Sequence, residues 1–336
     1  MSLIGFLLIG GYDGVPFGEL KALCNSSGFP YNIVGVYDRI VIIESNEEIV
    51  DYVVKRASMV HLGGLIFFMS RPIVDEIVEA MQKIALPFPV SSFLVRIKRV
   101  GVPKNQVDVS KLESMLGSVI VSKGFSVDLN KPKYKFIGLF GRDVFVLLLE
   151  KGSVDRGKFM ERRPSKRPFF HPSAMETWLA RALVNLSEAK EDDIVVDPFC
   201  GTGGLLIEGC FMNIRMIGID LDWEMCKGAL RNIRFYGLWN ADIIRGDAAC
   251  IPLRYFSKIV TDPPYGKDAS TMGRTHQDLV RELLKQSFSV SKIVYGSFKG
   301  SNVKSIEDEL KFVCKDSFEI RIHRSLTRNI RVVEPQ

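Results

Sequence analysis

The second half of the chain alternates short apolar runs with helical segments, and this order restricts the possible folds more than any other feature. The apolar runs have the length and composition of buried strands; they lie at residues 194–197, 216–220, 242–247, 259–262 and 293–297. Segments of helical periodicity flank them, at residues 174–185, 203–212, 223–236, 277–289 and 303–310. Such alternation predicts an α/β fold with a parallel sheet covered on both faces. Two final strand-like runs, residues 318–323 and 328–333, predict a closing antiparallel pair.

The first half of the chain mixes strands and helices without this strict order. Strand-like runs occur at residues 3–9, 33–36, 39–43, 93–97, 136–139 and 144–149, and helical segments at residues 17–25, 47–56, 73–82 and 109–122. We therefore expect a small α+β region. Residues 151–168 are rich in Lys, Arg, Gly and Pro, which predicts an exposed basic linker. Its charges are typical either of a solvated surface or of a contact to a phosphate backbone.

The composition limits the class of the protein without naming a function. A chain of 336 residues is longer than a usual single core, so two or three domains are expected. A net charge of +6 and a pI near 8.9 are compatible with a polyanionic partner but do not require one. The six cysteines form no C-x-x-C pair and there are only four histidines, so we expect no metal site and reduced thiols in a cytoplasmic protein. No apolar segment is long enough to predict a membrane span.

Three successive predicted strands end in an aspartate. Asp197 is followed at once by a glycine-rich turn that opens a helix, which lets backbone amides approach a ligand. Asp220 can accept hydrogen bonds from both hydroxyls of a ribose, and Asp247 from an adenine amino group. One alternative is that these aspartates only cap turns, but capping would not explain three successive strand ends. The other is a nicotinamide-binding fold, which would favour G-x-G-x-x-G over the observed D-P-F-C-G-T-G-G. The predicted cofactor is S-adenosylmethionine, bound by Asp197, Phe199, Cys200, Gly201, Thr202, Gly203, Asp220, Leu221, Asp247 and Ala248.

The run T-D-P-P-Y at residues 261–265 follows the fourth predicted strand, at the sheet edge where such folds bind ligands. It looks like the catalytic tetrapeptide of enzymes that methylate exocyclic amines. The carboxylate of Asp262 and the carbonyl of Pro263 can each accept one N–H of a planar amine, and the rigid Pro263-Pro264 pair fixes that carbonyl. Tyr265 offers a flat face on which the target base can stack. A plain Pro-rich loop is the alternative, but it does not explain the position after a strand.

These motifs, together with several others, resemble those of archaeal tRNA methyltransferases that act on N2 of guanosine 10. The matching segments span nearly the whole chain: R-R-P and R-P-F-F-H-P within residues 162–172, A-R-A-L-V-N-L at 180–186, residues 195–204, residues 261–266 and H-R-S-L-T-R at 323–328. The resemblance implies a Rossmann-like methyltransferase domain preceded by a ferredoxin-like and THUMP region. It also implies that His171 and Pro172 flank the cofactor pocket.

In the first half of the chain, F-L-V-R-I-K-R at residues 93–99 resembles the THUMP strand that faces RNA. The implied domains are a ferredoxin-like subdomain at residues 1–50, a THUMP domain at 51–150, the basic linker at 151–168 and the methyltransferase domain at 169–336. The implied phosphate contacts are Arg96, Lys98, Arg99, Lys133 and Arg142. Each of them, taken singly, is as typical of a solvated surface.

The expected activity is therefore transfer of one or two methyl groups to N2 of guanosine 10 in tRNA. An adenine-N6 methyltransferase is an alternative, since it uses the same tetrapeptide, but no domain for recognising duplex DNA is evident. A catalytically silent tRNA-binding protein is the second alternative, and the retention of every expected carboxylate argues against it. The protein partners and the oligomeric state are not specified by any of these patterns.

Overall fold

The computed structural model describes residues 1–265, 273–323 and 326–336, and the chain forms two compact units. The N-terminal unit comprises residues 1–10, 27–55 and 60–154; the C-terminal unit comprises residues 11–26, 56–59 and 155–336. Three residues of the motifs named above, Gly266, Arg324 and Ser325, lie outside the described residues. Within the described ranges, no helix combines the length and the apolar character needed to cross a bilayer.

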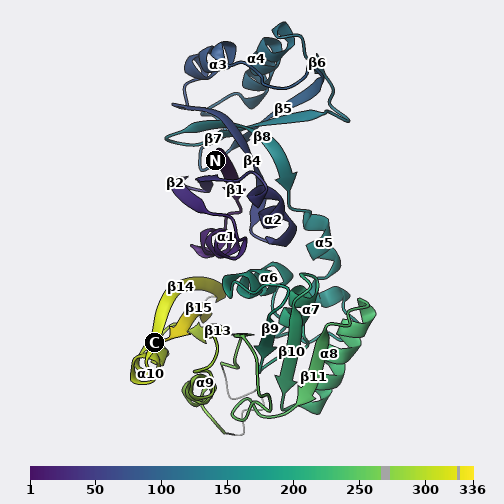
Figure 1. Cartoon of the computed structure of the whole chain (residues 1–336), viewed down its shortest axis with the longest axis vertical. Coiled ribbons are helices and arrows are strands. Elements are labelled where there is room, and N and C mark those ends of the chain that lie inside the picture. The colour runs from purple at the N-terminus through teal and green to yellow at the C-terminus, as the bar shows by residue number, and fades with distance from the viewer. Residues whose placement is uncertain (266–272, 324–325) are drawn as a thin grey trace. The chain divides into compact units, whose positions relative to one another are not determined.

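The N-terminal unit is built on one mixed sheet (Figure 1). Its strands are β1 (Ser2–Leu8), β2 (Tyr31–Tyr37), β3 (Ile40–Ser45), β4 (Val60–Ser70), β5 (Ser92–Arg99), β6 (Ser126–Val127), β7 (Tyr134–Phe140) and β8 (Phe145–Ser153). Their order is β2-β3-β1-β4-β8-β7-β5-β6, with β5 parallel to β6 and β7 and the other pairs antiparallel. Helices α3 (Val74–Lys83) and α4 (Val109–Ser122) bury Ile77, Leu112 and Leu116 in an apolar core with β5 and β7, while α2 (Ile49–Arg56) follows β3. The α+β character expected for this half is confirmed.

Strand β4 was not predicted, although it lies in the middle of this sheet between β1 and β8. Gly63 and Gly64 interrupt its apolar run, and buried and exposed positions do not alternate along it. Both usual signals of a strand are therefore weak, and only the pairing with two neighbours identifies it.

The C-terminal unit contains the predicted parallel sheet (Figure 1). Its strands are β9 (Ile194–Asp197), β10 (Arg215–Asp220), β11 (Ala241–Arg245), β12 (Lys258–Thr261), β13 (Lys292–Phe298), β14 (Phe312–His323) and β15 (Leu326–Pro335). Their order is β11-β10-β9-β12-β13-β15-β14, parallel from β11 to β13, while β15 runs antiparallel to both β13 and β14. The helices are α6 (Thr177–Leu186), α7 (Gly204–Cys210), α8 (Trp223–Phe235), α9 (His276–Lys285) and α10 (Val303–Glu309). The chain moves outward from β9 to β11 and then returns to β12 on the other side of β9, and ligands bind at such a switch point.

Most residues of the segment predicted as an exposed basic linker are exposed, but two of its arginines are buried in the C-terminal unit. Residues 151–153 end β8, and α5 (Arg156–Glu161) and the 3-10 turn η1 (Pro164–Lys166) follow. Arg162 and Arg167 are only 7% and 5% exposed. Arg162 binds both carboxylate oxygens of Glu208 on α7, at 2.8 and 3.0 Å, and Arg167 donates to the carbonyl of Arg162. Composition suggested solvent exposure because it cannot show a buried carboxylate that attracts these arginines.

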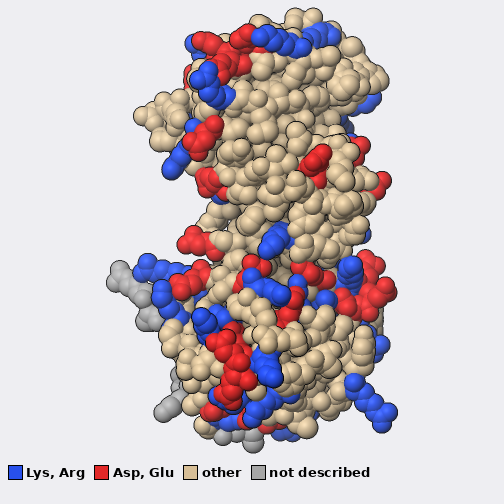
Figure 2. All heavy atoms as spheres, turned by 60° about the vertical axis from the view of Figure 1, so that its left-hand side comes forward, with Lys and Arg blue, Asp and Glu red and all other residues tan. Residues whose placement is uncertain are grey.

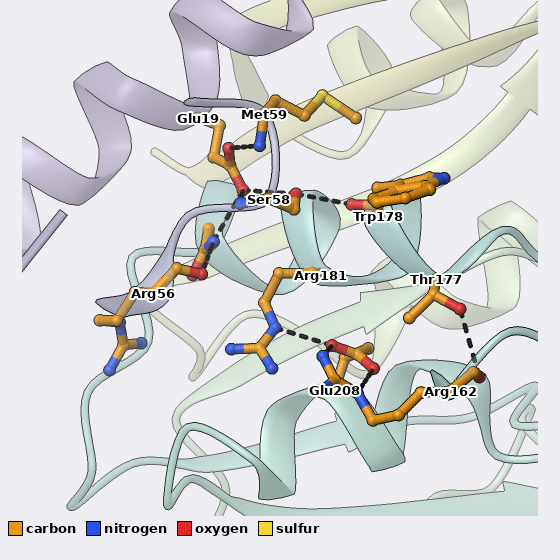
Figure 3. Close-up of polar contacts among 10 residues, drawn as sticks. Glu19, Arg56, Ser58, Met59, Arg162, Thr177, Trp178, Arg181 and Glu208 are labelled. Atoms are coloured by element: carbon orange, nitrogen blue, oxygen red, sulfur yellow. Dashed lines mark hydrogen bonds and ion pairs between the residues drawn. The ribbon is translucent and has the colours of Figure 1, made fainter. Parts of the chain in front are cut away.

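Helix α6 joins two early segments of the chain to this unit (Figure 3). Glu19, on α1 (Val15–Ser26), is fully buried, and its carboxylate accepts from the amide of Ser58 at 3.0 Å, the amide of Met59 at 2.7 Å and the side chain of Asn185 on α6 at 2.8 Å. Arg181, also on α6, donates to Glu208 at 2.9 Å. Buried carboxylates are tolerated only when they are bonded in this way, so α1 and residues 56–59 are part of the frame around the sheet.

Candidate active site

A cavity of about 450 Å³ lies at the carboxyl ends of β9, β10 and β12. Thirteen of the predicted cofactor and catalytic residues line it: His171, Asp197, Phe199, Cys200, Gly201, Thr202, Asp220, Leu221, Ala248, Asp262, Pro263, Pro264 and Tyr265. The predicted residues Pro172, Gly203 and Asp247 are not among the lining residues. One cavity therefore combines the predicted cofactor loop with the predicted catalytic tetrapeptide.

The glycine-rich loop is held in place by two of the strand-end aspartates. The Asp220 carboxylate accepts from the amide of Gly201 at 2.8 Å, and the Asp197 carboxylate accepts from the amide of Phe199 at 3.2 Å. Gly203 has a φ of 79°, a left-handed conformation that favours glycine, and it is the N-cap of α7. The loop and the N-terminus of α7 thus form a rigid wall of the cavity, and Glu208 anchors the same helix from behind.

Asp247 lies two residues beyond the end of β11, and its carboxylate is already engaged. One oxygen accepts from the amide of Ala249 at 2.9 Å and forms an ion pair with Arg274 at 3.0 Å. Partial burial raises the pKa of Asp247, but these two partners outweigh it and lower that pKa overall. Its neighbour Ala248 lines the cavity, as does Arg274 itself.

The predicted catalytic tetrapeptide follows β12 directly, and Asp262 is bound on both carboxylate oxygens. Arg328 on β15 donates to one oxygen at 2.9 Å, and the hydroxyl of Tyr265 donates to the other. The side chains of Asp262 and Arg328 are only 18% and 11% exposed. Gly296 on β13 lies against this group, since a Cβ there would come within 1.8 Å of the Asp262 carboxylate. The sheet thus leaves room for the Asp262 carboxylate only because position 296 has no side chain.

His276, the first residue of α9, supports the same loop from the other side. Its Nδ1 lies 3.1 Å from the carbonyl oxygen of Pro264, and its Nε2 lies 3.2 Å from the hydroxyl of Ser297. Burial lowers the pKa of His276, so the ring is neutral near pH 7 and donates from Nδ1 to the carbonyl. Its ring also contacts that of Tyr265, with centroids 5.3 Å apart.

Burial dominates the titration of three of the carboxylates that line this cavity. Burial raises the pKa of Asp197 to about 7, although the hydroxyl of Thr261 donates to it at 2.6 Å and acts in the opposite direction. Burial likewise raises the pKa of Asp220, and that of Asp262 against the opposing effect of Arg328. Among the described residues, no group of three or more His, Cys, Asp or Glu side chains could hold a metal ion.

Several residues of the site were not among the predicted site residues. They line the cavity or support the predicted motifs: Ser173, Ala174, Met175, Pro198, Gly204, Leu205, Asp222, Met225, Gly246, Arg274, His276, Leu279, Gly296 and Arg328. Gly204, Asp222 and Gly246 adjoin predicted positions, so proximity to the strand ends could have suggested them. Arg328 belongs to a recognised motif, but nothing in the motif indicates its contact with Asp262.

The five predicted RNA contacts lie in the N-terminal unit. Arg96, Lys98, Lys133 and Arg142 are exposed and Arg99 is partly buried. Arg99 pairs with Phe140 at the carboxyl end of the β5–β7 ladder, close in sequence to Arg142, whereas Lys133 adjoins the opposite end, about 20 Å away along the strands. On the face of the molecule in Figure 2, basic and acidic side chains are interspersed and do not form a continuous basic area.

Comparisons with known proteins agree with this arrangement. Residues 164–322 match the family described as RMKL-like, methyltransferase domain. A tRNA (guanine(10)-N2)-dimethyltransferase of Methanothermobacter thermautotrophicus is 34% identical over 95% of this chain and 96% of its own length. A relative with the same name from Methanocaldococcus jannaschii is 31% identical over 98% of this chain and 99% of its own.

Solved structures show the same fold at lower identity. TrmN from Thermus thermophilus has a TM-score of 0.55 at 17% identity and covers 99% of this chain and 100% of its own. SMU.472, a putative methyltransferase solved with SAH, has a TM-score of 0.55 at 14% identity and covers 100% of this chain and 99% of its own. With the full-length similarity to the two archaeal enzymes, these matches show that the chain belongs to the archaeal tRNA (guanine(10)-N2)-dimethyltransferase family.

Proposed function

We propose that the protein transfers methyl groups from S-adenosylmethionine to N2 of guanosine 10 in tRNA, producing N2-methylguanosine and N2,N2-dimethylguanosine. The observation that carries the proposal is the single cavity in which the glycine-rich loop and the Asp262–Tyr265 tetrapeptide meet. Full-length similarity to enzymes named for this reaction supports the choice of substrate.

The residues on the cofactor side of the cavity fit a ligand with a ribose and a positively charged centre. The Asp220 carboxylate, partly buried at the end of β10, can bind the ribose hydroxyls, and the loop from Phe199 to Gly203 can provide close backbone contact. Asp197, Asp220 and Asp262 give this part of the cavity carboxylates that suit a cation. When bound, S-adenosylmethionine supplies an electrophilic methyl group on a sulfonium.

The residues on the substrate side fit a planar exocyclic amine. One oxygen of Asp262 and the carbonyl of Pro263 can accept the two N–H groups, which directs the nitrogen lone pair toward the methyl donor. The carboxylate also stabilises the positive charge that develops on the nitrogen. Tyr265 provides the stacking surface. A guanine inside a helix cannot reach this cavity, so the base must be flipped out or already unpaired.

The N-terminal unit supplies the proposed contacts to the rest of the tRNA, and we assign the THUMP role to residues 51–150. Arg96 and Lys98 are exposed at alternate positions of β5, so they point to the same side of the sheet. We propose that these two side chains bind phosphates, and that Arg99, on the opposite side of the strand, and Arg142 add further contacts near the same end of β5. Lys133 contributes separately, from the other end.

The test is nucleoside mass spectrometry of an unmodified tRNA transcript after incubation with enzyme and S-adenosylmethionine. We expect N2-methylguanosine first and N2,N2-dimethylguanosine later, and neither in a transcript with adenosine at position 10. Asp262→Asn should abolish both products while binding of S-adenosylhomocysteine persists. Asp192→Asn, at an exposed position outside the cavity, is the matched control and should be fully active.

Two results would contradict the proposal. Methylated adenosine would indicate the adenine-N6 alternative. A wild-type protein that binds tRNA and S-adenosylhomocysteine but forms no methylated nucleoside would indicate the silent RNA-binding protein.

A further inference from the structure

Both carboxylate oxygens of Asp262 already have a partner in this structure, although the proposed role of Asp262 is to bind an amine. Its two oxygens are taken by the guanidinium of Arg328 and by the hydroxyl of Tyr265. Arg328 also donates from Nε to the Tyr265 hydroxyl at 3.1 Å. The three groups form a closed, mostly buried triangle, so an incoming N–H must either share an Asp262 oxygen with one of these partners or displace that partner.

The two partners of Asp262 differ in how firmly they are held. Arg328 lies in β15, the strand between β13 and β14, and pairs with Phe298 on one side and Ile320 on the other. Its backbone is therefore fixed inside the sheet, and its guanidinium is a rigid, permanently charged fork. Tyr265 lies on the loop after β12, and its hydroxyl can leave Asp262 by rotation of a single side chain.

Asp262 needs a nearby cation to remain ionised, because it is buried beside another carboxylate. Burial raises the pKa of Asp262, and Arg328 on β15, the Tyr265 hydroxyl and His276 on α9 act in the opposite direction, in that order of size. Asp197 on β9 bonds Thr261, the residue before Asp262, so a further carboxylate lies close by. Arg328 is the permanent cation paired with Asp262 in the structure, since burial lowers the pKa of His276 and keeps that ring neutral.

We propose that Arg328 is a positioning residue that holds one oxygen of Asp262 and keeps the carboxylate an anion, while the oxygen now bound by the Tyr265 hydroxyl receives the N–H of the target amine. This division of the two oxygens rests on the proposed methyl transfer to guanine N2. The Tyr265 hydroxyl occupies the amine's place in the free protein, and the amine displaces it. Arg328 stays bound throughout, so it acts on the reaction only through Asp262.

The test measures the single-turnover rate constant for methylation of a tRNA transcript as a function of pH. It compares the wild type with Arg328→Lys, Arg328→Met and Arg328→Gln. Removing the guanidinium should shift the acidic limb of the profile upward by about one pH unit or more in the two neutral variants. Arg328→Lys should shift it less, because an ammonium preserves the charge. Binding of S-adenosylhomocysteine should be unchanged in all of them.

Arg331→Lys is the matched control. Arg331 is a buried arginine of the same strand, but it pairs with Glu307, away from the cavity. Its replacement should lower the melting temperature without moving the pH profile. Two neutral variants are made in case one does not fold; if neither folds, an Arg328→Lys variant that loses the same fraction of activity at every pH would overturn the proposal.

The proposal is also overturned if the neutral variants lose the same fraction of kcat at every pH, or if their acidic limb coincides with that of the wild type. Either result would mean that Arg328 supports only the fold. Failure of the proposed function would look different, since wild-type enzyme would then form no methylguanosine at any pH.

Discussion

Replacing Gly296 by alanine should disable the site without unfolding the protein. In the structure a Cβ at this position would lie 1.8 Å from the Asp262 carboxylate and 2.5 Å from the Tyr265 hydroxyl, whereas real Cβ contacts are essentially never shorter than 3.0 Å. The carboxylate must therefore move by roughly 1 Å or more, and a misplacement of this size costs about 100-fold in rate. Gly296 lies in the middle of β13, paired with Ile330, so the strand itself can accept alanine.

The assay is single-turnover methylation of a tRNA transcript, with S-adenosylhomocysteine binding measured by calorimetry. We expect kcat to fall about 100-fold, with unchanged affinity for S-adenosylhomocysteine. Gly117→Ala is the matched control, because a Cβ there would meet nothing within 4 Å, and it should be fully active. A wild-type kcat for Gly296→Ala would refute the idea that the position of Asp262 limits the reaction.

Three further predictions concern stability, pH and stacking. Glu208→Gln leaves Arg162 and Arg181 buried without their anion, so we expect a loss of about 3–5 kcal/mol in the free energy of unfolding, measured by urea denaturation; a loss below about 1 kcal/mol would contradict this. Burial raises the pKa of Asp197 to about 7 from a usual 3.8, so the folded protein retains a proton that the unfolded chain has released. Its contribution to stability therefore falls as pH rises from about 4 to 7, and Asp197→Asn should reduce this fall in denaturant titrations at pH 5 and 8; an unchanged slope would refute it. Tyr265→Phe should keep kcat within a few-fold because the ring remains, whereas Tyr265→Ala should lose about 10- to 100-fold; equal losses would show that the hydroxyl, not the ring, is essential.

The strand ends of the C-terminal sheet could be predicted closely because the signal is local. Asp197 and Asp220 end their strands as expected, and the tetrapeptide follows β12 directly. Asp247 and Lys133 show the limit of such patterns. The sequence predicted that Asp247 ends its strand, but β11 ends at Arg245, and the bond of Asp247 to Arg274 comes from a segment 27 residues further along the chain. Lys133 looked like a companion of Arg99, yet the parallel pairing of β5 and β7 places them at opposite ends.

The class of the sheet, the cofactor loop and the expected chemistry of the tetrapeptide could be predicted from the sequence, because they depend on residues adjacent in the chain. The packing of the chain in three dimensions shows that Arg162 is buried on Glu208, that Glu19 fixes α1 to α6, and that Arg328 binds Asp262. In each case a hydrogen-bond donor and its carboxylate acceptor are 46 to 166 positions apart in the sequence. Burial and pairing of charges are properties of the packed core, and a local pattern of residue types contains no information about which distant partner satisfies them.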